Sequence, residues 1–248
     1  MNSISPNLNI MIKACEKASK VIIRDFGEVE HLQVSQKGPK DFVTKTDMRV
    51  EKILIEELSK SKKNFSFISE ETGIILNSNK DSYWIIDPID GTNNFLHGIP
   101  HFAISIALKI NDEITCGLII DPIKNEMFYA EKNNGSFFNN QRIRVSNKNK
   151  IDECLFASNN KGVEFANRDL NLRSTGSAAL DLAYVSAGRF DGYFQNNINI
   201  WDIAAGVILV KEAGGKINNF NNKENQNINI RAASTNIYEK MMEKIAKF

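Results

Sequence analysis

Two aspartates, Asp87 and Asp90, lie three residues apart directly after an apolar segment of this 248-residue chain. Pro88 between them favours an extended Asp87, and Gly91 after them allows a sharp turn or a close approach to a ligand. Carboxylate oxygens suit hard divalent cations, and main-chain N–H groups at a turn suit phosphate. The run therefore predicts metal-assisted phosphate chemistry, although Asp-Pro and Asp-Gly pairs are also common in plain turns.

Three further acidic groups lie where we expect a strand to end or a helix to begin. Glu70 and Glu71 follow a short apolar segment, and Asp202 lies at the start of an apolar helix. Asp41 and Asp47 lie before and at the start of another predicted helix. Acids are common at helix starts, so an N-terminal cap is the alternative interpretation of Asp47 and Asp202.

The composition limits the class of protein. A hydrophobic share of 42% and a charged share of 25% are ordinary for a soluble globular protein. The net charge of +1 argues against a dedicated nucleic-acid surface. No apolar segment approaches the roughly 18–20 residues that span a bilayer, and no signal peptide is evident. The cysteines form neither a disulfide framework nor a metal motif, which favours a reducing cytoplasm; they are Cys15, Cys116 and Cys154.

Apolar periodicity predicts a mixed α/β protein with a β-meander in its middle. We expect a helix over 7–26, a loop entering an extended piece over 37–43, and a second helix from near Asp47. One domain over residues 1–248 is expected, with sheet-and-helix halves of about 1–145 and 146–248. The other predicted strands are 65–68, 83–86, 102–109, 114–120, 126–130, 135–139, 153–157, 191–195, 216–219 and 229–233, and the other predicted helices are 178–187, 202–213 and one from about 236.

Several motifs resemble the inositol monophosphatase family in their order, spacing and residue identities, and the resemblance covers nearly the whole chain. It implies a five-layer α/β/α/β/α sandwich and the hydrolysis of small phosphate monoesters by water that Mg²⁺ activates, with two to three ions. It also implies Li⁺ sensitivity and a homodimer. The motifs are DFVTKTD at 41–47, EE at 70–71, WIIDPIDGTNNF at 84–95, LHGIPHF at 96–102, which is similar to bacterial members, and WDIAAG at 201–206.

The resemblance implies roles for single residues near the central motif. Thr92, supported by Asp47, matches the group that positions and deprotonates the attacking water. Glu70 matches a further catalytic residue. The main-chain N–H groups of Gly91 and Thr92 match the phosphate cradle. The metal ligands implied are Glu70, Asp87, Asp90 and Asp202, with the main-chain carbonyl of Ile89.

The part of the site that meets the alcohol is implied by the segment Gly176, Ser177 and Ala178. Gln195 departs from the family pattern, which usually has a glutamate at this position. A glutamine keeps an acceptor oxygen, loses the charge and adds a donor. Strict specificity for inositol is therefore in doubt, whereas the metal site is not affected.

The leading hypothesis is a phosphatase of myo-inositol 1-phosphate or a similar small polyol or sugar phosphate. The alternatives in the same superfamily are phosphatases of histidinol phosphate, fructose 1,6-bisphosphate or 3′-phosphoadenosine 5′-phosphate. Asn93 and Asn94 after the central motif fit the inositol type better. A non-catalytic regulatory or binding protein on the same fold is the alternative from another class. The polar stretch 73–82 and the Asn-rich tract 218–229 carry no assigned role.

Overall fold

The computed structural model describes residues 4–32, 39–160, 170–219 and 225–245, without the side chains of residues 30–32 and 39–44. The side chain of Asp41 and residues 220–224 of the Asn-rich tract therefore lie outside the described residues. The helices are α1 (Pro6–Leu32), α2 (Pro39–Ser61), α3 (Thr92–Leu96), α4 (Ala178–Ser186), α5 (Ile200–Glu212) and α6 (Tyr238–Ile245), with a 3₁₀ turn at Ile151–Glu153.

The strands form two mixed sheets within the described residues. Eight strands pair in the order β2-β1-β3-β4-β5-β6-β7-β8, and five pair in the order β10-β9-β11-β13-β12. The first sheet contains β1 (Phe65–Ser69), β2 (Gly73–Ile75), β3 (Asn79–Asp90), β4 (Ala103–Ile110), β5 (Glu113–Asp121), β6 (Glu126–Glu131), β7 (Gly135–Phe138) and β8 (Gln141–Ile143). The second contains β9 (Leu155–Ala157), β10 (Asn171–Arg173), β11 (Gly192–Ile198), β12 (Gly215–Ile217) and β13 (Ile228–Ser234).

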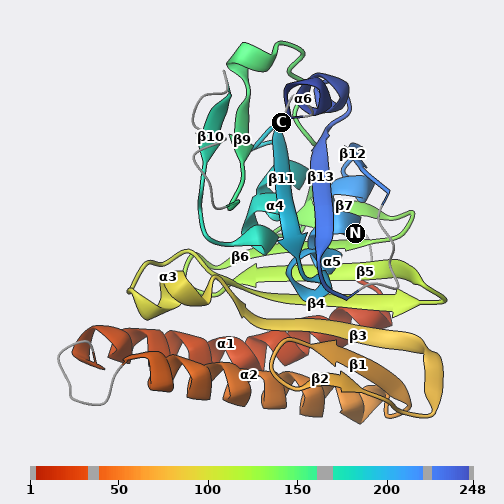
Figure 1. Cartoon of the computed structure of the whole chain (residues 1–248). Coiled ribbons are helices and arrows are strands. Elements are labelled where there is room, and N and C mark those ends of the chain that lie inside the picture. The colour runs from red at the N-terminus through yellow and green to blue at the C-terminus, as the bar shows by residue number, and fades with distance from the viewer. Residues whose placement is uncertain (1–3, 33–38, 161–169, 220–224, 246–248) are drawn as a thin grey trace.

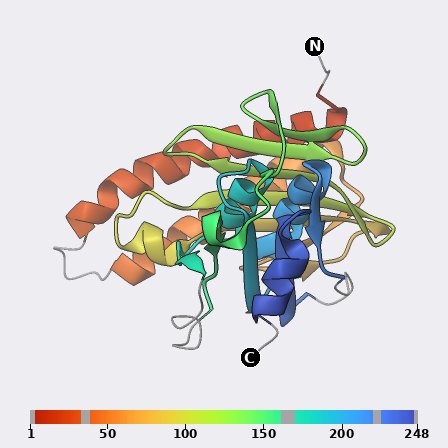
Figure 2. The ribbon, with the colours of Figure 1, turned by 90° about the horizontal axis from the view of Figure 1, so that it is seen from above.

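The elements stack in five layers, as predicted. Helices α1 and α2 cover one face of the first sheet, α4 and α5 lie between the two sheets, and α6 covers the second sheet (Figure 1). The view from above shows α6 over the second sheet (Figure 2). Three apolar clusters fill the spaces between these layers. Burial of this apolar surface is the main favourable term in folding.

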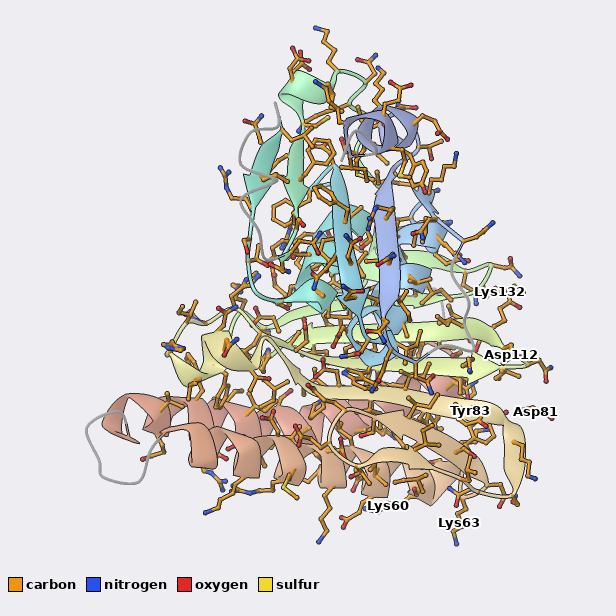
Figure 3. The ribbon with its side chains drawn as sticks, viewed as in Figure 1. Lys60, Lys63, Asp81, Tyr83, Asp112 and Lys132 are labelled. Atoms are coloured by element: carbon orange, nitrogen blue, oxygen red, sulfur yellow. The ribbon has the colours of Figure 1, made fainter. Side chains whose placement is uncertain are left out.

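Strand β3 belongs to two of these clusters because successive side chains of a strand point to opposite faces. Trp84 and Ile86 pack with α1 and α2, whereas Ile85 packs toward α4 and α5. At its outer end, Tyr83 lies near Asp112 of the β4–β5 turn (Figure 3). The Nζ atom of Lys109 lies 5.0 Å from the centre of the Tyr83 ring and 3.7 Å from Asp112 Oδ1, so this end is held by cation–π and ionic contacts.

Two predictions about local structure were wrong. Helix α2 begins at Pro39, well before Asp47, and replaces the extended piece expected up to residue 43. Proline is favoured in the first helical turn, so Pro39 is compatible with this start. The expected turn at 87–90 is the end of β3 instead, and α3 follows after Gly91.

The chain passes from the first sheet to the second between β8 and β9, close to the predicted boundary at residue 145. Helix α5 packs against strands of both sheets. The division into halves of 1–145 and 146–248 stays a prediction. None of the described helices is long and apolar enough to cross a membrane.

Candidate metal centre

A bulge in β3 brings Asp87 and Asp90 to the same side of the sheet. In a regular strand, residues three apart point to opposite faces. Here Asp87 pairs with Ser105 and Asp90 with Ala103, so β3 has one residue more than β4 between these pairs. Pro88 lies in this irregular stretch, where a missing N–H costs no ladder hydrogen bond.

Asp202 reaches the two aspartates from the first turn of α5. One oxygen from each of Asp87, Asp90 and Asp202 lies within 4.8 Å of the others. The main-chain N–H of Asn199 donates to Asp202 Oδ2 at 3.0 Å. The cap interpretation was therefore correct for Asp202 and wrong for Asp47, which lies inside α2. The cap does not exclude a site at Asp202, because a carboxylate has several acceptor positions.

Asp90 also connects the two sheets through the start of α4. Its Oδ2 accepts hydrogen bonds from the Ser177 hydroxyl and from the Ala179 N–H, the latter at 2.8 Å. The Ala178 N–H lies 3.3 Å from Oδ1. Asp90 is thus held at a helix N-terminus, where the unpaired N–H groups and the dipole favour negative charge.

Glu70 joins the group from the end of β1. β1 and β3 are parallel, Ser69 pairs with Ile86, and the Glu70 N–H donates to the Ile86 carbonyl at 3.3 Å. The Glu70 side chain interacts with Asp87, and this contact lowers the pKa of Glu70 and raises that of Asp87. Glu70 is the exposed member of the group. A cavity of about 500 Å³ lies beside it, lined also by Glu71 and Trp201.

Burial raises the pKa values of all four carboxylates. Burial raises the pKa of Asp87 well above its usual range, and the charges of Glu70, Asp90 and Asp202 add to the rise. Burial is the largest cause in the others too: the pKa is about 6 for Asp90, about 7 for Glu70 and about 8 for Asp202. Buried like charges are unfavourable unless a cation lies between them.

This donor set fits a hard divalent cation. It consists of oxygen atoms, and Asp87 and Asp90 are almost fully buried. Mg²⁺ takes oxygen ligands and keeps several waters, so a few carboxylates are enough for one or more ions. A cation would also offset the repulsion that raises the pKa values. The four carboxylates could therefore hold Mg²⁺.

The family model described as "Inositol monophosphatase family" matches residues 4–247 of this chain. This chain belongs to the inositol monophosphatase family.

Curated relatives of the chain carry two kinds of name. It is 40% identical to an inositol-1-monophosphatase of Caulobacter vibrioides, with 95% of this chain and 99% of that protein covered. It is 39% identical to the Nus factor SuhB of Haemophilus influenzae, with 98% and 96% covered. The structure of the extragenic suppressor protein suhB from Bartonella henselae matches with a TM-score of 0.87 at 41% identity, covering 98% of this chain and 99% of that one.

The predicted water-positioning residues come from two helices: Thr92 begins α3, and Asp47 lies within α2. The Thr92 hydroxyl donates to the Ile89 carbonyl at 2.9 Å. Asp47 is buried, and its Oδ1 has no hydrogen-bond partner among the described residues. Burial, followed by the charges of Glu71, Glu70 and Glu51, raises the pKa of Asp47 to about 8. Gly91, directly before Thr92, has a φ of 98°, which glycine adopts without strain.

The residues of the predicted alcohol-binding segment differ in their exposure to solvent. Gly176 is exposed, whereas Ser177 and Ala178 are buried against Asp90. The Ser177 hydroxyl also accepts from the Leu180 N–H and caps α4. Gln195 is half-buried on β11, and its Oε1 accepts a hydrogen bond from the Tyr193 hydroxyl.

Two acidic residues next to the site were missed from the sequence. Asp181 is fully buried and accepts from the Thr175 hydroxyl at 2.7 Å and from Asn159 Nδ2 at 2.8 Å. Glu51 is 1% exposed and lies one helical turn after Asp47 on α2. The spacing of four residues between Asp47 and Glu51 was a usable signal, since residues i and i+4 share a helix face.

Proposed function

We propose that this chain is a Mg²⁺-dependent phosphomonoesterase that hydrolyses myo-inositol 1-phosphate or a similar small polyol phosphate. The observation that carries the proposal is the convergence of Asp87, Asp90 and Asp202 within 4.8 Å, from elements far apart in the sequence. Buried carboxylates that destabilise one another are a poor structural device but a suitable cation site. Membership of the inositol monophosphatase family supports the same reaction class.

In this proposal Glu70, Asp87, Asp90 and Asp202 hold two to three ions, with the Ile89 carbonyl as a further ligand. When bound, Mg²⁺ lowers the pKa of water and offsets the charge on the phosphoryl group. The main-chain N–H groups of Gly91 and Thr92 bind the phosphate. The Gly176 segment and Gln195 contact the alcohol.

The Thr92 hydroxyl orients the attacking water. Its proton is committed to the Ile89 carbonyl, so its oxygen lone pairs are available to accept a hydrogen bond from water. Asp47 has a raised pKa and a buried oxygen that has no partner within the part of the chain that the structure describes, so it can take up a proton near neutral pH. We propose direct in-line attack without a phosphoenzyme. Hydrolysis in isotopically labelled water of a substrate whose phosphorus is made chiral by oxygen isotopes should invert the configuration at phosphorus, and retention would exclude this mechanism.

A phosphate-release screen tests the function and the substrate together. The panel contains myo-inositol 1-phosphate, histidinol phosphate, fructose 1,6-bisphosphate and 3′-phosphoadenosine 5′-phosphate, each with Mg²⁺ and with chelator. We expect the fastest release from the inositol phosphate and none with chelator. Preference for another compound would correct the substrate, and Gln195 is the position that we would then examine first.

A regulatory role is the second candidate, because relatives named Nus factor SuhB match the chain about as well as those named inositol-1-monophosphatase. If no compound of the panel released phosphate with Mg²⁺, the regulatory role would be favoured. We also propose a homodimer in the cytoplasm. Light scattering of the purified protein would check the dimer, and cell fractionation would check the location.

A further inference from the structure

The carboxylate of Glu51 accepts hydrogen bonds from the turn that carries Glu70. Its Oε2 accepts hydrogen bonds from the Ser69 hydroxyl and from the Glu71 N–H at 3.0 Å. Its Oε1 accepts from the Thr72 N–H at 3.0 Å and from the Thr72 hydroxyl. Four donors from three residues around Glu70 therefore converge on one side chain of α2.

These hydrogen bonds restrict the position of the Glu70 main chain. The Glu70 side chain is exposed, so little packing around it restricts its position. On one side, the Glu70 N–H is tied to the Ile86 carbonyl, next to Asp87. On the other side, the residues that follow Glu70 are tied to Glu51. The turn between these two attachments has little freedom, and a carboxylate must be well placed to share a cation with its neighbours.

The buried position of Glu51, close to other acids, is energetically unfavourable for a charged side chain. Its carboxylate adds to the charges that raise the pKa values of Asp47, Glu70 and Glu71. A buried carboxylate beside other acids is unfavourable unless its oxygens are fully hydrogen-bonded. The four donors meet that need. A neutral residue could fill the same space without repulsion, so the carboxylate is better explained by what it holds than by packing.

We propose that Glu51 is a positioning residue for the metal centre: it sets the Ser69–Thr72 turn so that Glu70 can share a cation with Asp87. Glu51 does not touch the cation or the substrate and acts only through this turn. The inference rests on the proposed function, because it requires that the centre binds Mg²⁺. Groups that orient ligands in this way typically contribute 10–100-fold to metal affinity.

Glu51→Gln is the informative substitution. A glutamine has nearly the same shape, but one of its two positions becomes an NH₂ group. The Glu71 N–H lies on one side of the carboxylate and the Thr72 N–H on the other. Either orientation of the amide therefore opposes two donors and loses a main-chain hydrogen bond. Glu56→Gln is the matched control, since Glu56 is an exposed acid on the same helix.

The test is calorimetric titration with Mg²⁺, together with the melting temperature in chelator and kinetics over a range of Mg²⁺ concentrations. We expect E51Q to bind Mg²⁺ about 10-fold or more weakly than the wild type, and E56Q to bind it normally. Excess Mg²⁺ should restore most of the kcat of E51Q. A lower melting temperature with unchanged Mg²⁺ affinity would mean that Glu51 is merely structural and would overturn the proposal.

Thr72→Val provides a second variant in case E51Q does not fold. It removes one side-chain donor to Glu51 and keeps the main-chain bond, so we expect a smaller loss of Mg²⁺ affinity in the same direction. Normal Mg²⁺ affinity in this variant would count against a positioning role for the hydrogen bonds to Glu51. The wild type distinguishes the two proposals: if it binds no Mg²⁺, both fail, whereas if it binds Mg²⁺ and E51Q binds equally well, only the role of Glu51 fails.

Discussion

The hydroxyl of Ser177 donates to Oδ2 of Asp90, 87 residues earlier in the chain. This bond joins the bulged end of β3 in the first sheet to the start of α4, which packs against the second. Ser177 accepts from the Leu180 N–H with the same oxygen. One hydroxyl thus begins a helix and orients a proposed metal ligand, so the position of Asp90 depends on how the layers pack together.

Ser177→Ala should weaken both the fold and the centre. The loss of the helix cap costs about 1 kcal/mol, to be measured by urea unfolding in chelator. The hydrogen bond from Ser177 lowers the pKa of Asp90, so its loss should raise that pKa and shift half-maximal Mg²⁺ binding to higher pH. Ser174→Ala, which removes an exposed hydroxyl nearby, is the control. An unchanged pH dependence in S177A would contradict the assignment.

Asp87→Asn and Asp90→Asn should both abolish most turnover but change metal-free stability in opposite directions. In D87N the amide removes a buried charge, and its oxygen can still accept from the Ile89 N–H, as Asp87 Oδ1 does at 3.0 Å. We therefore expect D87N to melt at a higher temperature than the wild type in chelator.

For Asp90, the main-chain N–H groups of Ala178 and Ala179 face different carboxylate oxygens. An amide at this position must place its NH₂ group against one of them, so D90N should melt lower. Melting curves in chelator measure both variants. A decrease for D87N would show that its charge is not destabilising, and near-normal turnover in either variant would refute its role as a ligand.

Metal-free stability should fall as the pH rises from about 4, the pKa of Asp90, Glu70 and Asp202 in the unfolded chain, to about 8, the highest of their folded values. Asp90, Glu70 and Asp202 have pKa values of about 6, 7 and 8 in the folded protein, above those of the unfolded chain. In this range the folded state binds more protons than the unfolded state, so deprotonation favours unfolding. Mg²⁺ favours the charged form, and its stabilising effect should grow with pH. Melting curves with chelator and with Mg²⁺ check both trends, and a rise of metal-free stability with pH would contradict the pKa values.

Gly91→Ala should destabilise the protein and reduce activity. Gly91 has a φ of 98°, where an L residue costs about 1–2 kcal/mol. An added Cβ would also lie 3.1 Å from the His101 carbonyl oxygen and 3.2 Å from Phe102 Cβ. Gly27→Ala in α1 is the control, because its Cβ meets no described atom within 4 Å and should stabilise the helix by up to about 1 kcal/mol. Urea unfolding measures both, and equal stability of G91A and wild type would exclude strain at this turn.

Much of the fold was predictable from local patterns. The apolar periodicity placed most of the strands of the first sheet and the helix at 202–213 within a few residues of β3–β7 and α5. The short strands β2, β8 and β10 were missed, because three residues carry too little periodicity to be recognised. The start of α2 was misjudged because a proline and a glycine at 38–39 indicate a loop as readily as a helix start.

Local sequence patterns are enough to identify the residues that are available for chemistry. Two acids around a proline, a glutamate pair after a strand and an aspartate in the first turn of an apolar helix are local features. How these acids come together depends on the packing of the folded chain. Contacts between segments far apart in the chain create the bulge between Asp87 and Asp90, the hydrogen bond from Ser177 and the hydrogen bonds to Glu51. Such pairings are selected by the packing of whole layers, which leaves no local signal at the residues that they orient.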